Sequence, residues 1–417
     1  MTITLWEDKQ SGLTNSEMDS NFTELANGCI AQSAIDNRPL VKPTLNLDFT
    51  KGILDSRITF TRNSTATYFG SDGLLKTSGI NQPRFEYDPI TRQPKGLLIE
   101  ESRTNLLTYS EQFDNAIWSK VGTTVVANNT IAPDGSLTAD TITFSSGGYI
   151  YQTIYPTFSA GTAYTFSIYT KNSVRALTWG GATPSGTDVW SVTSVGNGWY
   201  RQSLTRTFTN AGTGAIVQAL LNDVYQGTGS FFYWGAQLEQ GAFPTSYIPT
   251  TSTQVTRSYD NAFIASSGFS HRSDEGTLYA EAFTPLGQAA GSNNSTIVTI
   301  GNPNGYLARI AYNASLNPRF ASMNNSLAVI SVFAPATSAT VIKYAGAYSM
   351  SQVSIALSVN GGTVVTSNTL LPLAIVTPLV QIGFFGSTPD GIWNSCIKKI
   401  AYYPKRLTDT QLQEITK

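Results

Sequence analysis

The sequence has little charge, only one histidine and only two cysteines. Charged residues make up 13% of the 417 residues, and 26 basic against 27 acidic side chains leave a net charge of -1. A protein that binds nucleic acid normally carries a basic face, because contacts to phosphates dominate its affinity. We therefore exclude nucleic acid as a partner. The single histidine, His271, excludes a metal site or relay built from several histidines, and we interpret it as a solvated residue between two domains.

Several other features are missing from the sequence. The two cysteines, Cys29 and Cys396, lie near opposite ends of the chain, so they form no disulfide framework and indicate folding in a reducing cytoplasm. The first residues do not resemble a secretory signal, and no apolar stretch is long enough to insert into a membrane. The usual signatures of nucleophilic, phosphoryl-transfer and zinc chemistry are absent as well. We expect no cofactor, no metal and no enzymatic activity.

Glycine, proline and aromatic residues are plentiful, with 35 Gly, 18 Pro, 20 Tyr and 20 Phe. This composition is typical of many short strands joined by tight turns, with aromatic and β-branched side chains filling the cores. The fold class that we predict is mainly β, with tandem antiparallel, jelly-roll-like β-sandwiches after a short N-terminal helical anchor.

The helical anchor is predicted within residues 1–43. Thr14 and Glu17 form a capping-box pattern, and apolar residues at the helical spacing of four and three follow at Met18, Phe22 and Leu25. Two turns of helix are too short to be stable alone in water, so a partner surface is needed. That surface is either the rest of the chain or further copies around an oligomer axis.

Strand and turn patterns follow along the rest of the chain. The predicted strands are Ile58–Thr61, Ala66–Phe69, Ala163–Tyr169, Tyr200–Phe208, Ala215–Leu221, Ser230–Leu238 and Gly276–Thr284. Asn360 and Gly361 predict a type I′ hairpin turn. At the C-terminus, Thr408 and Gln411 form a second capping box, with Leu407 and Leu412 placed as a hydrophobic staple.

One segment, residues 45–107, resembles a known family. The stretches ITFTRNSTATYF, GSDGLLKT, NQPRFEYDP and GLLIEESRTNLL occur there in this order. They are similar to an element that recurs in bacteriophage tail-fibre and spike proteins. The resemblance implies a virion protein that is made in the host cytoplasm, attaches to other tail or head proteins through its N-terminus and assembles as a homotrimer.

Two further regions resemble sugar-binding domains. SEQFDNAIWSK, NGWYRQSLTRTF and FFYWGAQLEQGAFPTSYIPT look like carbohydrate-binding modules, and SCIKKIAYYPKRLTDTQLQEIT looks like the end of a concanavalin-like or laminin-G-like domain. We therefore divide the chain into an attachment segment, a small β-rich connector and two sandwiches, over residues 1–43, 44–107, 108–256 and 257–417. The resemblance implies receptor binding, in which the chain adsorbs to a host-surface polysaccharide or lipopolysaccharide. The alternatives are a purely structural fibre or decoration protein and a polysaccharide depolymerase.

Sugar binding usually needs an aromatic face beside polar side chains. Trp118, Trp199 and Trp234 fall in core-like motifs, so we predict that they are buried. Two other places combine tryptophan with polar neighbours, and they supply the predicted ligand-binding residues Trp179, Asp188, Trp190, Asp390, Trp393 and Asn394. Asp390 would also suit a calcium site, but one carboxylate is too few for that ion.

A depolymerase would need two carboxyl groups on either side of a glycosidic bond. The candidates are Glu100, Glu101, Glu239 and Asp188. Adjacent residues on an extended chain point to opposite faces, so Glu100 and Glu101 cannot flank the same bond. Arg103 is a natural ion-pair partner for this pair, and Glu239 is expected to fix a turn.

Overall fold

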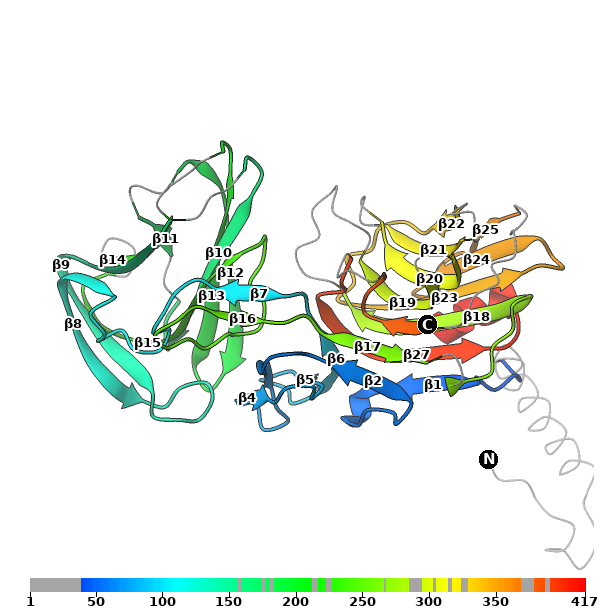
Figure 1. Ribbon diagram of the computed structural model, residues 1–417, viewed down its shortest axis with the longest axis horizontal. Coiled ribbons are helices and arrows are strands. Elements are labelled where there is room, and N and C mark those ends of the chain that lie inside the picture. The colour runs from blue at the N-terminus through cyan, green and yellow to red at the C-terminus, as the bar shows by residue number, and fades with distance from the viewer. Residues whose placement is uncertain are drawn as a thin grey trace, which may run out of the picture.

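The computed structural model contains two β-sandwiches joined at one narrow junction (Figure 1). It describes residues 39–417 except 156–158, 175–176, 181–183, 212–216, 223–226, 266–267, 285–294, 303–304, 314–316, 324–328, 369–378 and 387–390. The predicted N-terminal helix lies outside the described residues. The prediction of a mainly β fold with antiparallel sandwiches is confirmed.

One sandwich is built from both ends of the described chain, and we call it the composite sandwich. Its first sheet contains β1 (Leu45–Asp48), β5 (Phe85–Tyr87), β6 (Pro94–Ile99), β18 (Glu275–Phe283), β23 (Val341–Ser349), β24 (Ser354–Val359), β25 (Val365–Ser367) and β27 (Ser395–Tyr403). Its second sheet contains β2 (Ile58–Thr61), β17 (Asn261–Ile264), β19 (Thr296–Asn302), β20 (Gly305–Tyr312), β21 (Pro318–Met323), β22 (Val329–Phe333) and β26 (Val380–Ile382). Figure 1 shows the blue N-terminal strand β1 beside the red C-terminal strand β27.

The other sandwich, which we call the inserted sandwich, is a single curled sheet of eight strands. They are β8 (Ser119–Thr130), β9 (Ala139–Ile154), β10 (Ala163–Lys171), β11 (Thr178–Trp179), β12 (Gly186–Gly196), β13 (Trp199–Phe208), β14 (Val217–Asn222) and β15 (Gly229–Gln240). Small elements complete the fold: the pair β3 (Ala66–Phe69) and β4 (Leu75–Ser78), the pair β7 (Arg103–Asn105) and β16 (Val255–Arg257), the 3-10 turn η2 (Phe49–Lys51) and the helix α3 (Asp409–Thr416).

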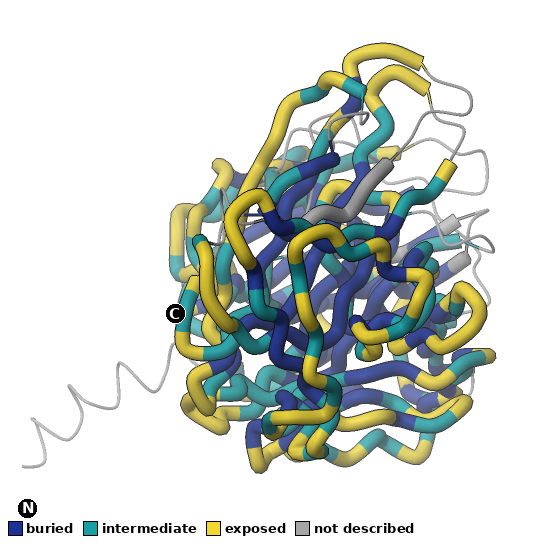
Figure 2. Tube along the Cα trace, turned by 90° about the vertical axis from the view of Figure 1, so that its left-hand side faces the viewer, coloured by how far each residue is buried: buried dark blue, intermediate teal, exposed yellow. Residues whose placement is uncertain are grey.

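Each sandwich has its own apolar core. In the composite sandwich, one cluster of buried side chains joins the two sheets and includes Leu45 and Ile99 from the early strands together with Ile310 and Ile400 from the late ones. Figure 2 shows the buried residues running along the strands and the exposed residues gathered in the connecting loops. The late strands therefore require side chains of the early strands to complete the core of the composite sandwich.

This arrangement differs from the sequence-based division at residue 107. β1 pairs with β27 in the register Leu45↔Tyr402, and β6 pairs with β27 in the register Ser395↔Ile99. Gly96, in the GLLIEES stretch, has a φ of 101°, and a Cβ there would lie 2.2 Å from the carbonyl oxygen of Ile397. Pairing between strands so far apart in sequence leaves no periodic signal, so residues 44–107 read as a connector when only neighbouring residues are compared.

Several local predictions are confirmed. The predicted strands Ile58–Thr61 and Ala66–Phe69 are β2 and β3. Asn360 and Gly361 both have positive φ, as a type I′ turn requires, although the ladder resumes only at Val365. Thr408 caps α3 in a complete capping box with Gln411. The residues of the predicted staple, Leu407 and Leu412, are both buried against the alanine-rich outer face of the first sheet.

The junction between the sandwiches encloses five buried charged side chains, which we call the junction network: Arg62, Arg84, Glu100, Arg257 and Asp260. Arg62 donates to Asp260 over 3.0 Å, and Arg84 donates to Glu100 over 2.7 Å and to Asp260 over 2.5 Å. Arg257 forms a further ion pair with Glu100. Charges removed from water are tolerated only when they are paired and hydrogen-bonded, so each member depends on the others.

The junction network reaches into the inserted sandwich through Ser246. Its backbone N–H and its hydroxyl each donate to Glu100 over 2.7 Å, and the hydroxyl also lies 2.8 Å from Nη1 of Arg84. β7 and β16 lie antiparallel beside it, with Asn105 opposite Val255. The chain therefore leaves and re-enters the composite sandwich at adjacent points.

β7 and β16, the strands that connect the two sandwiches, are adjacent. We therefore expect that the inserted sandwich can be deleted without unfolding the composite sandwich. We expect a chain in which residues 106–254 are replaced by a short Gly-Ser loop to remain soluble and to unfold cooperatively in urea, followed by circular dichroism. The matched comparison is the fragment 257–417, which lacks β1, β2, β5 and β6 and should aggregate because its core is left uncovered. A soluble, cooperatively unfolding 257–417 fragment would contradict this organisation.

Replacing Glu100 with Gln should destabilise the protein by about 3–5 kcal/mol, because it leaves Arg84 and Arg257 undercompensated in a buried site. Burial alone would raise the pKa of Glu100, but Arg257 and Arg84 outweigh it and lower that pKa to about 2. The ionised carboxylate therefore contributes fully to the free energy of unfolding at a pH above 4.5, its ordinary pKa. This contribution is lost as the pH falls toward 2. Urea unfolding of the wild type and of E100Q across this range measures both effects.

The control for E100Q is Glu414→Gln, which removes an exposed ion pair with Lys417. We expect it to change stability by less than about 0.5 kcal/mol. Equal stabilities of E100Q and E414Q at pH 7 would mean that the junction network does not stabilise the fold.

Candidate functional site

Trp190 is the exception among the tryptophans. Of the six in the described part of the chain, five are at most 6% exposed, whereas Trp190 is 47% exposed. The predicted burial of Trp118, Trp199 and Trp234 is confirmed. An indole left open to solvent on a β-sandwich is available to stack on a ligand, so Trp190 marks the first candidate site.

Trp190 lies on β12, an edge strand of the inserted sandwich. Successive side chains of a strand point to opposite faces, so Asp188 and Trp190 share one face. β13 places Arg206 opposite Asp188 and Leu204 opposite Trp190. The guanidinium of Arg206 holds both carboxylate oxygens of Asp188, over 2.6 and 2.7 Å. The edge strand thus presents an aromatic ring beside a fixed pair of opposite charges.

Trp179 adjoins this arrangement from β11. It is buried in the core of the inserted sandwich, and its ring centre lies 5.8 Å from the guanidinium carbon of Arg206. The structure therefore brings Trp179, Asp188 and Trp190 together through Arg206, and we call these four residues the Trp190 face. Trp179 is a buried member of this face. It offers no second exposed ring on which a ligand could stack, because its indole packs in the core.

Sequence analysis did not single out Arg206. The β12–β13 hairpin turns at Asn197 and Gly198, which both have positive φ, and this turn could have been read from the sequence. The register shifts by one residue between Ser194 and Gly196, however. If the register continued from the turn without that shift, Asp188 would lie opposite Thr207. A prediction from the position of the turn alone would therefore give Asp188 the wrong partner.

The second predicted site, around Trp393, is not open to a ligand. Trp393 is fully buried and stacks on Tyr312, with ring centres 5.8 Å apart. Asn394 is buried as well: its Oδ1 accepts from the backbone N–H of Glu101 over 2.8 Å, and its Nδ2 donates to that carboxylate over 3.1 Å. These two expectations are corrected, because Trp393 packs in the core of the composite sandwich and Asn394 is bonded to Glu101. Asp390 lies outside the described residues.

The four carboxylates considered for glycoside hydrolysis all have partners. Glu100 belongs to the junction network, and Glu101 pairs with Arg103, the partner that the sequence suggested. Glu239 accepts from the backbone N–H and the hydroxyl of Thr245, over 2.9 and 2.8 Å, and so fixes the turn that follows β15, as expected. Asp188 is held by Arg206.

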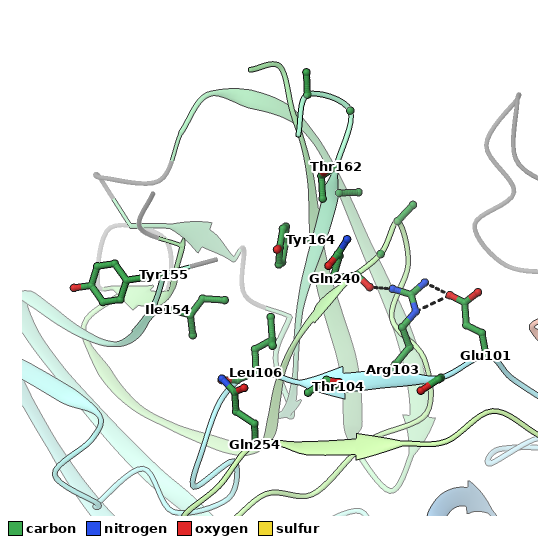
Figure 3. Close-up of a pocket in the computed structure, with 16 residues that line it drawn as sticks. Glu101, Arg103, Thr104, Leu106, Ile154, Tyr155, Thr162, Tyr164, Gln240 and Gln254 are labelled. Carbon is green, nitrogen blue, oxygen red and sulfur yellow. Dashed lines mark hydrogen bonds and ion pairs between the residues drawn. The ribbon is translucent and has the colours of Figure 1, made fainter. Parts of the chain in front are cut away.

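A groove of about 990 Å³ lies along the inserted sandwich near the junction (Figure 3). Its charged residues, Glu101 and Arg103, neutralise each other, and Arg103 also donates to the carbonyl of Gln240. The amide of Gln254 donates to the carbonyl of Leu106 over 2.9 Å. Figure 3 shows the ring of Tyr155 at the far end, away from Arg103. The groove offers a polar surface, but its polar groups are largely satisfied by the protein.

No cluster of three or more His, Cys, Asp or Glu side chains among the described residues could hold a metal ion. No helix among them is long and apolar enough to cross a membrane. His271 is half-buried, and burial lowers its pKa; its ring lies 5.7 Å from that of Phe269, so it is not the solvated residue that the sequence suggested.

Comparison with known proteins places the chain in no family. No protein-family model and no curated protein matches it. Among solved structures, the CBM40 of the Ruminococcus gnavus IT-sialidase bound to α2,3-sialyllactose is 14% identical over 34% of this chain and 83% of that chain, with a TM-score of 0.29. The botulinum neurotoxin serotype G binding domain is 12% identical over 37% of this chain and 40% of that chain, with a TM-score of 0.30.

A third similar structure is the heptameric SAP-like pentraxin from Limulus polyphemus. It is 11% identical over 34% of this chain and 70% of that chain, with a TM-score of 0.27. At these identities and TM-scores the likenesses carry no argument about function.

The correction at Asn394 leads to a stability prediction. Asn394 has a φ of 50°, and both of its side-chain hydrogen bonds are partly buried. Asn394→Gly and Asn394→Ala should each lower the free energy of unfolding by about 1–3 kcal/mol, because the backbone N–H of Glu101 loses its partner. Ala should lose about 1 kcal/mol more than Gly, since it is strained at positive φ. Urea unfolding of the two variants tests this, and equal stabilities would contradict the strain argument.

Proposed function

We propose that the protein is a non-enzymatic glycan-binding subunit and that the Trp190 face holds the sugar. One observation carries the proposal: Trp190 is exposed, whereas the other five described tryptophans are buried. Exposing an indole forgoes the gain from burying it, about 25 cal/mol for each Å² of apolar surface. A ligand that covers the ring recovers that energy.

The chemistry of the Trp190 face suits a pyranose ring. The indole stacks on the apolar side of the sugar, as aromatic side chains do in carbohydrate sites. Asp188 accepts hydrogen bonds from sugar hydroxyls, and Arg206 donates to them, because each keeps unused bonding capacity beyond their mutual ion pair. The ion pair also holds both side chains in place before binding, which lowers the entropy lost when the ligand is ordered.

The setting that we propose is a bacteriophage tail fibre or spike. It is supported by the motifs of residues 45–107, which supply Arg62, Arg84 and Glu100 to the junction network. In this proposal the chain is a virion protein, forms a homotrimer and attaches to other virion proteins through residues 1–43. The ligand is a host-surface polysaccharide or lipopolysaccharide, and three copies of a weak site gain avidity without new contacts.

Binding without catalysis is favoured by the state of the carboxyl groups. A glycosidase needs one carboxyl group that protonates the leaving oxygen and a second across the bond. Glu100 is buried between two arginines that keep it ionised, and Glu239 is buried in a turn. Neither can transfer a proton to a bound sugar, so we do not favour the depolymerase alternative.

The test is the substitution Trp190→Ala in the full chain. We expect at least a tenfold loss of affinity for the glycan, equivalent to about 1.4 kcal/mol, because the stacking surface is removed. Binding is measured on an array of bacterial polysaccharides and lipopolysaccharides and then by titration of the best ligand. The matched control is Phe333→Ala, which removes an exposed aromatic ring from β22, an edge strand of the composite sandwich.

The results separate the alternatives. Loss of binding in W190A but not in F333A supports the Trp190 face. Equal binding by both variants would place the sugar elsewhere and overturn the site. A wild-type chain that binds no glycan on the array would favour the purely structural role, and shortened polysaccharide chains after incubation would establish a depolymerase.

A further inference from the structure

A second cavity lies between the two sandwiches, on the other side of β12. It has a volume of about 420 Å³, within the range of roughly 300–1,000 Å³ that is typical of small-molecule sites. Val189, Ser191 and Thr193 line it from β12. These odd-numbered positions alternate with Asp188 and Trp190, so the strand presents the Trp190 face on one side and this cavity on the other. We call the cavity the interdomain pocket.

The interdomain pocket contains a buried hydroxyl without a partner. Tyr169, on β10, is fully buried, and its hydroxyl forms no hydrogen bond with the described protein. Its ring is fixed by Trp234 and Tyr247, with ring centres 5.4 and 6.1 Å away. The hydroxyl is influenced electrostatically by Arg201 and Glu86, which also line the pocket. Tyr169 thus belongs both to a buried cluster of the protein and to the residues that line the pocket.

Charged groups from both sandwiches face the pocket in balanced number. Glu86, Asp88 and Lys95 come from the composite sandwich and Arg201 from the inserted one, giving two acidic and two basic side chains. A fifth lining residue, Glu100, is already neutralised in the junction network. Since burial raises the pKa of Glu86 to about 7, these four side chains carry between zero and one net positive charge near neutral pH, so the pocket does not require a charged ligand.

Two of these groups have spare hydrogen-bonding capacity. Oε2 of Glu86 accepts from the backbone N–H of Phe69 over 3.0 Å, and burial raises the pKa of this carboxyl to about 7, so it can both donate and accept near neutral pH. Nε of Arg201 is buried without a partner in the described residues. Only a ligand that donates and accepts at several points satisfies these groups together with the hydroxyl of Tyr169.

Aromatic residues also line the pocket. They are Tyr68 and Phe69 of β3 and Phe243 of the loop after β15. Hydroxyls around an apolar ring face match this combination of aromatic and hydrogen-bonding groups. We propose that the interdomain pocket binds a neutral polyhydroxylated ring of hexose size, at a site separate from the Trp190 face.

The experiment uses the full chain and three neutral hexoses, D-glucose, D-galactose and D-mannose, with D-glucuronate as the anionic comparison. Binding is followed by saturation-transfer NMR titration. We expect Tyr169→Phe to weaken hexose binding about three- to tenfold, the effect of losing one hydrogen bond. Its unfolding midpoint in urea should not fall, because the hydroxyl has no partner in the described protein.

A second variant, Thr193→Trp, places a large ring at an exposed position that lines the pocket and should abolish binding by filling its mouth. F333A serves as the control and should bind the hexoses normally, because Phe333 lies on β22 and does not line the pocket. Weakening by Y169F and T193W with unchanged binding in F333A supports the proposal, whatever the outcome of the glycan array.

Other results would overturn the proposal. No hexose bound by the wild type at 50 mM, about 2 kcal/mol of binding energy, would mean that the pocket holds only water. Binding that is lost in W190A and kept in Y169F would place the sugar on the Trp190 face. Tighter binding of D-glucuronate than of the hexoses would show that the pocket selects an anion.

Discussion

The structure depends on the buried ion pairs between its two sandwiches. Three arginines and two carboxylates lie out of water there, and removing one partner would leave an uncompensated charge. Arg62 and Arg84 come from the segment before the insertion, and Arg257 and Asp260 from the segment after it. The junction network therefore ties the segment before the insertion to the segment after it, and the inserted sandwich adds the hydrogen bonds of Ser246 to Glu100.

This constraint also positions both candidate sites. Ser246 connects the turn after β15 to Glu100, and the same turn contributes to the interdomain pocket. Odd-numbered residues of β12 line that pocket. Trp190 is an even-numbered residue of the same strand, so its side chain points to the opposite face. A single edge strand thus contributes residues to both surfaces.

Much of the local structure could be predicted. β2, β3, the Asn360-Gly361 turn and the capping box of α3 all follow from patterns within a few residues. The burial of three tryptophans followed from their core-like motifs. The predictions for Trp393 and Asn394 failed because a tryptophan beside polar residues looks the same in sequence whether it stacks on a sugar or on Tyr312.

By itself the sequence determined the fold class, the turns and caps and the choice of Trp190 as a candidate, since each depends on neighbouring residues and strand periodicity. Only the tertiary structure decided that the early strands complete the C-terminal sandwich and that Arg206 joins Trp179 to Asp188. It also showed that Trp190 alone among the described tryptophans stays exposed. The reason is physical: strand partners are chosen by burial of a shared core, and a one-residue register shift between Ser194 and Gly196 sets which side chains meet.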